Sequence, residues 1–126
     1  MKTVISTAKT PAVIGPYAQG IVINGLVYTS GQLPINVQSG DMPASIEAQT
    51  RQSLTNVRHI LEAAGSDMDQ VIKTTVFLSD MNHFTAMNAV YAEFFSDGQF
   101  PVRSAVEVAR LPKDALVEIE AIACLK

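Results

Sequence analysis

The dipeptide Asn24-Gly25 constrains the fold of this chain more than any other short stretch of its sequence. Runs of β-prone residues flank it, at 17–23 on one side and at 26–30 on the other. An Asn-Gly pair readily adopts the positive φ angles of a type I′ turn, whose twist matches that of two antiparallel strands. The sequence therefore predicts a β-hairpin here, and the fold has to contain a sheet that includes it.

Two helical patterns and a further strand follow the hairpin. Apolar positions in residues 45–64 recur at helical spacing, with Ser45 as the N-cap and Gly65 as the residue that ends the helix. Residues 71–78 are rich in β-branched and aromatic side chains, which predicts a central strand. A second helix with an aromatic and methionine stripe is expected over about 81–95, and this stripe is read as core.

Two more strands are predicted near the end of the chain. In the first, within residues 100–110, alternate positions hold a set of mostly apolar side chains: Val102, Ser104, Val106 and Val108. This valine set is expected to face the core, which puts Arg103 in the middle of the other face. A buried guanidinium without a partner is very costly, so Arg103 needs a protein carboxylate, in a structural ion pair, or an anionic ligand. The last strand is predicted over 115–125.

The resulting order is ββ-α-β-α-ββ, with room for a further short strand at residues 3–6. Two helices that alternate with strands pack on one face of a single sheet. The opposite face is then expected to be uncovered and to mix apolar residues with four charged ones: Arg103, Glu107, Glu118 and Glu120. Such a face suits a subunit interface with polar clefts, so we expect a homo-oligomer.

Composition excludes several classes of protein. The 126 residues are enough for one domain, 1–126. A net charge of -3 gives no electrostatic footprint for nucleic acid, and no apolar run reaches the roughly 18 residues that a membrane helix needs. Cys124 is the only cysteine, which excludes an internal disulfide, and residues 1–4 lack the pattern of a signal peptide. We therefore expect a cytoplasmic protein that binds neither membranes nor nucleic acid.

The motif content leaves little chemistry to choose from. The chain has no phosphate-binding glycine loop, no nucleophile elbow and no Cys-x-x-Cys pair. Two histidines and one cysteine cannot build a usual zinc site, so neither a metal nor a cofactor is predicted. What remains is Arg103 on one strand and the pair Glu118 and Glu120 on another. These residues form either a salt bridge or a carboxylate anchor beside a water-activating base.

Several separated stretches resemble the RidA/YjgF family of reactive-intermediate deaminases. They are Ile14-Gly15-Pro16-Tyr17, Thr29-Ser30-Gly31-Gln32, residues 100–114 and residues 117–121, so that the resemblance covers essentially the whole chain. Its most specific part is Pro-x-Arg-Ser followed by Val-Glu-Val-Ala-Arg-Leu-Pro. The resemblance implies one RidA/YjgF-like domain with a chorismate-mutase-like α+β fold, in which two helices cover one face of a single mixed sheet. It also implies a homotrimer with its sites in clefts between subunits.

The same resemblance implies a 2-iminobutyrate/2-iminopropionate deaminase that uses no cofactor. Such an enzyme hydrolyses the reactive enamines and imines that pyridoxal-phosphate dehydratases release from serine or threonine, and it yields a 2-keto acid and ammonia. By position, Arg103 would hold the substrate carboxylate, Glu118 would orient or deprotonate the attacking water, and Tyr17 would close the pocket and assist proton transfer. The Gly31 backbone would supply hydrogen bonds, and Ser30 and Asn88 would line the cleft.

One position departs from the family pattern, and two other functions stay open. Many relatives carry a cysteine two residues after the arginine, whereas this chain has Ala105, so a thiol there cannot be essential. The first alternative is a regulatory trimer in which Arg103 captures a 2-keto acid without turnover. The second is a ribonuclease or translation inhibitor, against which the acidic charge and the lack of a basic stripe count.

Overall fold

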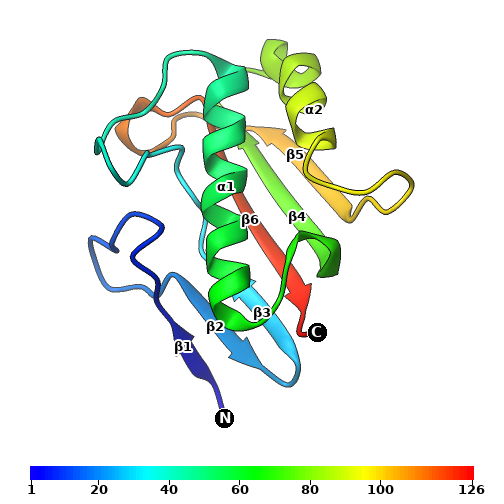
Figure 1. Cartoon of the computed structure of the whole chain (residues 1–126). Coiled ribbons are helices and arrows are strands. Elements are labelled where there is room, and N and C mark those ends of the chain that lie inside the picture. Colours follow the sequence, from blue (N-terminus) through cyan, green and yellow to red (C-terminus); the bar gives the residue numbers. More distant parts are fainter.

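A six-stranded sheet in the order β1-β2-β3-β6-β4-β5 is the framework of the protein in the computed structural model, which describes residues 1–126 (Figure 1). The strands are β1 (Thr3–Ile5), β2 (Gly20–Ile23), β3 (Leu26–Thr29), β4 (Val71–Leu78), β5 (Val102–Glu107) and β6 (Val117–Cys124). β4 and β5 run parallel, and every other neighbouring pair is antiparallel. The single mixed sheet expected from the resemblance is confirmed.

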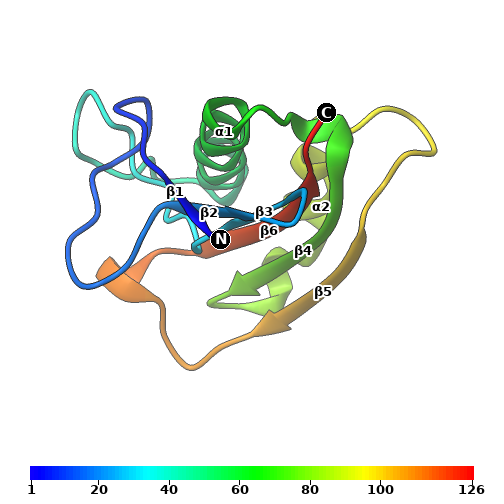
Figure 2. The ribbon, with the colours of Figure 1, turned by 90° about the horizontal axis from the view of Figure 1, so that it is seen from below.

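Two α-helices, α1 (Ile46–Ala64) and α2 (Phe84–Ala92), lie on the same side of this sheet, as Figure 2 shows. Short 3-10 turns at Met68–Gln70, Met81–His83 and Pro112–Asp114 precede β4, α2 and β6. The helix side of the sheet and the inner faces of α1 and α2 therefore form one core, and the predicted layer arrangement is confirmed. None of the helices is both long and apolar enough to span a membrane.

The hairpin at Asn24-Gly25 forms as the sequence predicts. Asn24 has φ 51° and Gly25 has φ 77°, and Ile23 pairs with Leu26 across the turn. The first strand is shorter than expected, because β2 begins only at Gly20. Residues 17–19 belong instead to the irregular segment that precedes β2. The side chain of Gln19 holds an earlier part of this segment by hydrogen bonds to the backbone of Thr7 and Pro11.

The helix termini also follow local sequence signals. Ser45 caps α1 by accepting a hydrogen bond from the Ala48 backbone amide at 3.1 Å, and Gly65 ends the helix in the left-handed conformation with φ 90°. The second helix is shorter than the predicted 81–95, because Asp80 caps a 3-10 turn before it. After it, residues 93–95 make i to i−3 hydrogen bonds that tighten the last turn.

The orientation of β5 differs from the sequence prediction. The side chains of Val102 and Val106 are 68% and 44% exposed, on the face away from the helices. Arg103 lies level with the buried Thr74 of the parallel strand β4, and its side chain reaches Asn88 of α2. The prediction that the valine set faces the core and that Arg103 lies on the uncovered face is wrong. The reason is that the register with β4, and not the apolar pattern of an edge strand, decides which face points toward the helices.

The face of the sheet opposite the helices, here called the open face, still mixes apolar and acidic residues. Glu118 and Glu120 lie on it, because they alternate along β6 with the buried Val117, Ile119 and Ala121. Exposed or half-buried apolar side chains lie on the same face: Val102, Val106, Phe77, Ile122 and Tyr28. Glu107 was also predicted here, but it lies level with buried Leu78 and accepts a hydrogen bond from the Met81 amide at 2.8 Å.

Candidate functional site

A cavity of about 870 Å³ lies where the N-terminal segment, the loop after β3 and the turn before β6 meet. Four of the predicted site residues line it: Tyr17, Ser30, Gly31 and Glu118. The rest of its wall is largely apolar and includes Val13, Ile14, Leu33 and Ile35, with Lys113 as the one cation. A cavity with apolar walls and a few polar groups is typical of a small-molecule site. It is called the Glu118 cavity below.

The carboxylate of Glu118 lies directly against Gly31. A Cβ atom placed on Gly31 would be 2.9 Å from Cδ and 3.1 Å from Oε2 of Glu118. Any side chain at this position would force the Glu118 carboxylate to shift, so glycine is what lets the carboxylate keep its place. The sequence indicated a close approach of something to Gly31, and that neighbour is the glutamate predicted to act on water.

The environment of Glu118 favours its protonated form. Burial raises the pKa of the Glu118 carboxyl, and the negative charge of nearby Glu120 raises it further. A carboxylate with a raised pKa is a better proton acceptor at neutral pH than an ordinary one. The side chain therefore has the chemistry that a general base needs.

Ser30 connects the end of β3 to the segment that carries Tyr17. Its hydroxyl donates a hydrogen bond to the Ala18 carbonyl at 2.6 Å, and its amide donates to the Gln19 carbonyl at 2.9 Å. Because Ala18 follows Tyr17 directly, these two bonds fix the backbone beside the phenol. Ser30 thus positions the rim of the cavity rather than presenting its hydroxyl to a ligand.

The other predicted residues, Arg103 and Asn88, line a separate cavity of about 440 Å³ beside α2. Arg103 Nη1 donates to Asn88 Oδ1 at 2.7 Å, and the guanidinium carbon lies 4.8 Å from the centroid of the Tyr91 ring and 5.5 Å from that of Phe84. Burial raises the pKa of Tyr91, so its phenol stays neutral and offers Arg103 no counter-charge. One amide and two aromatic faces hold the cation.

No carboxylate of the chain pairs with Arg103. The three ion pairs of the protein are Arg51–Glu93, Arg110–Asp114 and Lys126–Asp67. The structural ion pair considered from the sequence is therefore absent. The remaining donors of the guanidinium are free to bind a planar anion such as a carboxylate.

Within one chain the two groups of predicted residues do not meet. Glu118 lies on the open face of the sheet, whereas Arg103 points to the helix side of the edge strand, and the two line different cavities. One subunit therefore carries two partial sites: a base in an apolar cavity and a cation at an edge.

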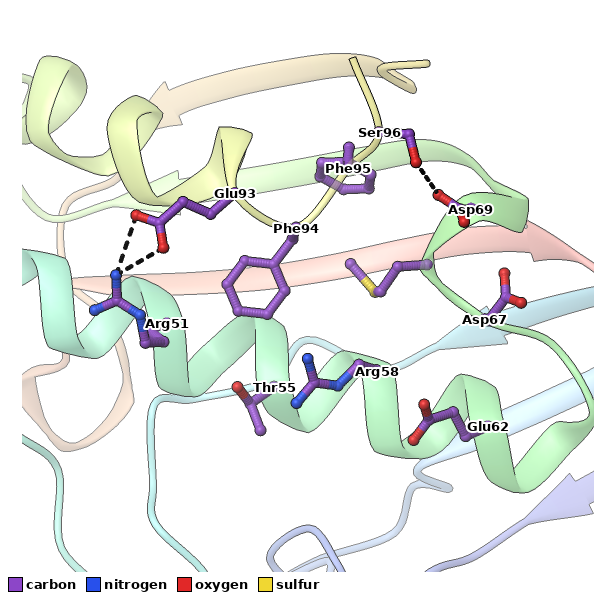
Figure 3. A pocket seen from close by; sticks show the side chains of 11 residues that line it. Arg51, Thr55, Arg58, Glu62, Asp67, Asp69, Glu93, Phe94, Phe95 and Ser96 are labelled. Atoms are coloured by element: carbon purple, nitrogen blue, oxygen red, sulfur yellow. Dashed lines mark hydrogen bonds and ion pairs between the residues drawn. The ribbon is translucent and has the colours of Figure 1, made fainter. Parts of the chain in front are cut away.

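A third cavity, of about 660 Å³, lies between α1 and the residues that follow α2 (Figure 3). Four of its polar residues already bind one another, because Arg51 pairs with Glu93 at 3.0 Å and Ser96 donates to Asp69 at 3.0 Å. The Arg58 guanidinium lies 5.7 Å from the ring centroid of Phe94 on its floor. None of the predicted site residues lines this cavity. Asp67 Oδ1 is buried there without a hydrogen-bond partner, and the other oxygen of the same carboxylate pairs with Lys126 at 3.1 Å.

Sequence reasoning missed the residues that shape the Glu118 cavity. On α1, Ser53 and Asn56 are buried and bind the backbone of the loop that lines this cavity, where Ser53 Oγ donates to the Gln32 carbonyl at 2.7 Å. Their spacing is helical, so a polar stripe within the apolar face could have been found by the same pattern. Gln19 carries no comparable signal in the sequence.

The chain matches known proteins along almost its full length. Residues 7–125 match the family model described as Endoribonuclease L-PSP. The 2-iminobutanoate/2-iminopropanoate deaminase of Escherichia coli K12 is 52% identical over 125 residues, which cover 98% of each chain. A RutC family protein of Haemophilus influenzae is 54% identical over 100% of this chain and 99% of its own.

Solved structures agree. That of E. coli TdcF with bound serine superposes with a TM-score of 0.94 at 48% identity, over 98% of this chain and 99% of the other. The structure of yeast Mmf1 gives a TM-score of 0.95 at 36% identity and covers all of both chains. Both the fold and the sequence are therefore shared over the whole domain.

Proposed function

Since this chain belongs to the Endoribonuclease L-PSP family, also known as YjgF/RidA, we propose that it is an imine deaminase that hydrolyses 2-iminobutanoate and 2-iminopropanoate. The observation that carries this conclusion is the 52% identity, over nearly the full chain, to an E. coli protein of that name. An unpaired Arg103 and a glutamate of raised pKa supply a carboxylate anchor and a base, which this reaction requires.

The proposed mechanism uses the protein's own groups only. Arg103 holds the carboxylate of the imino acid, and Glu118 takes a proton from water as the water oxygen attacks the imine carbon. Glu118 passes this proton to the imine nitrogen, so the product of the step is a neutral carbinolamine that carries a hydroxyl and an amino group. Glu118 then takes the hydroxyl proton and delivers it to the amino nitrogen as the C–N bond breaks, so ammonia and the 2-keto acid leave and the carboxylate is restored. Positioning and one base suffice, because an imine is already electrophilic.

We further propose that the working site forms between two subunits of a homotrimer. Arg103 and Asn88 of one subunit would face Tyr17, Ser30, Gly31 and Glu118 of the next. Two observations support this arrangement: the two partial sites lie on opposite sides of one sheet, and Val102 and Val106 expose apolar surface on the open face. A subunit packed there would bury that surface and bring the base to the cation.

The test couples purified protein to a serine or threonine dehydratase, with semicarbazide present to trap the free imine. We expect catalytic amounts of wild-type protein to outcompete the trap and to form keto acid. Arg103→Ala should lose this activity while staying folded, and Arg103→Lys should also be impaired, because an ammonium lacks the planar fork. Full activity in the alanine variant would refute the assignment of Arg103.

Two alternatives from the sequence each have an observation in their favour. A solved relative contains bound serine, which is compatible with a protein that binds small carboxylates without turning them over. Keto-acid binding by an inactive wild-type protein would support that role. The family model is described as an endoribonuclease, but the net charge of -3 argues against RNA as a ligand. RNA binding that weakens steeply with added salt would revive it.

We also propose a cytoplasmic location. The substrates arise where amino-acid dehydratases act, and a single cysteine without a disulfide suits a reducing compartment. Cell fractionation would test this, and recovery of the protein outside the cytoplasm would contradict it.

A further inference from the structure

The segment of residues 7–17, here called the arm, forms one wall of the Glu118 cavity without any regular structure. It is part of the blue chain that leaves β1 in Figure 1. Within the arm there is a single backbone hydrogen bond, from the Tyr17 amide to the Gly15 carbonyl at 3.0 Å. Because strand pairing does not hold the arm, side chains elsewhere in the protein have to do so.

The side chain of Gln19 supplies most of these contacts. Its Oε1 accepts a hydrogen bond from the Thr7 amide at 2.7 Å, and its Nε2 donates to the carbonyls of Thr7 and Pro11, both at 3.1 Å. The residue is only 5% exposed. One carboxamide thus binds both ends of the stretch 7–11 and acts as a strand partner would.

Packing beneath the arm does not replace these hydrogen bonds. A mostly apolar cavity of about 590 Å³ lies between the arm and β1, and Gln19 borders both this cavity and the Glu118 cavity. Thr10 is 1% exposed, yet its hydroxyl has no hydrogen-bond partner. The arm therefore has space to move into, and a second polar attachment exists only where His59 Nδ1 meets the Lys9 carbonyl at 3.1 Å.

The backbone of Gln19, in contrast, is rigidly held. Its carbonyl accepts the Ser30 amide at 2.9 Å. The next residue, Gly20, lies so close to α1 that an added Cβ would be 2.8 Å from Cγ2 of Ile60. The carboxamide therefore projects from a fixed point toward the arm.

We propose that Gln19 is a positioning residue of this deaminase, which fixes the apolar wall of residues 11–14 at the distance that the bound imino acid requires. The inference rests on the proposed function. Tyr17 does not depend on the same contact, because Ser30 holds the adjoining Ala18 carbonyl. Loss of the carboxamide therefore releases the wall and leaves Tyr17 and Glu118 in place.

Because Gln19 holds the wall and Ser30 holds the backbone beside Tyr17, loss of the Gln19 carboxamide should produce a specific kinetic defect. A wall that touches substrate and transition state equally contributes uniform binding, so its release raises KM and leaves kcat nearly unchanged. Removing a buried set of hydrogen bonds corresponds to a rise of about tenfold or more in KM, with kcat within about twofold of wild type.

The test variant is Gln19→Met, which keeps the length of the side chain and removes all three hydrogen bonds. Gln19→Glu, which keeps the acceptor but no amide donors, is the second variant should the first fail to fold. The matched control is Gln49→Met. Gln49 is equally buried and makes two side-chain hydrogen bonds, to the Pro43 carbonyl and from the Leu116 amide, but it does not touch the arm.

Steady-state deamination and amide hydrogen exchange are measured on all variants. We expect a raised KM in both Gln19 variants, faster exchange of the Thr7 amide in Gln19→Met, which lacks the acceptor of that amide, and neither effect in Gln49→Met. An unchanged KM, or an equal rise in Gln49→Met, would overturn the inference. An inactive wild-type protein would refute the proposed function instead, and the exchange rate of Thr7 would still decide whether Gln19 holds the arm.

Discussion

Glu118 and Gly31 are in such close contact that one methyl group added at residue 31 should lower the activity and leave the protein folded. In Gly31→Ala the new Cβ would push the Glu118 carboxylate out of position, since the undisturbed distance to Cδ is 2.9 Å. Misplacing a catalytic group by about 1 Å costs roughly a hundredfold in rate, so we expect kcat to fall by about that factor. The urea unfolding midpoint of Gly31→Ala is the control for stability, and we expect it to stay close to that of wild type, because the added methyl group meets a side chain that can move and no backbone. Wild-type kcat in Gly31→Ala would contradict this role for Glu118.

The raised pKa of Glu118 makes a second prediction at the scale of the residue. If the ionised carboxylate is the base, activity rises with pH as Glu118 loses its proton, and the raised pKa moves this limb above the range of an ordinary glutamate. Glu120→Gln removes the smaller of the two causes, so its acid limb should shift to lower pH. A pH profile of kcat would measure the shift. No difference between Glu120→Gln and wild type would show that burial alone sets the pKa.

At the scale of the element, the buried polar stripe of α1 holds the loop that faces Glu118. Asn56 is 0% exposed and donates to the carbonyls of Leu33 and Ile35 at 3.1 and 3.0 Å. Asn56→Leu would leave both carbonyls buried and unpaired, which costs about 2 kcal/mol of unfolding free energy. Urea unfolding at fixed protein concentration measures this loss, and an unchanged midpoint would contradict it.

The elements also show which parts of the fold could be predicted from the sequence. The turn at Asn24-Gly25, the cap at Ser45 and the strand 71–78 were predictable because short-range chemistry decides them. The face of the sheet to which Arg103 points was not predictable. The alternation along β5 shows only that Arg103 and the valines lie on opposite faces, and the pairing with β4 decides which of the two faces is the helix side. The resemblance named Arg103 and Glu118 together. No pattern within one chain indicated that they would lie in separate cavities.

At the scale of the whole molecule, a site shared between subunits makes subunit mixing informative. Arg103→Ala and Glu118→Gln should each be inactive alone. When equal amounts are unfolded and reassembled together, about a quarter of the interfaces would join an intact arginine to an intact glutamate. We therefore expect about a quarter of the wild-type activity from the mixture. No recovery, in particles that light scattering identifies as mixed trimers, would contradict a shared site.

The position of β6 has a consequence for how the protein is made in the cell. β6 comes last in sequence, yet it lies between β3 and β4 and joins the hairpin near the N-terminus to the rest of the sheet. The sheet cannot close until residues 117–124 have left the ribosome, so most of its long-range pairing is delayed to the end of synthesis. Glu118 arrives on that same strand. A nascent chain therefore lacks the proposed base until its last strand is made and the sheet can close.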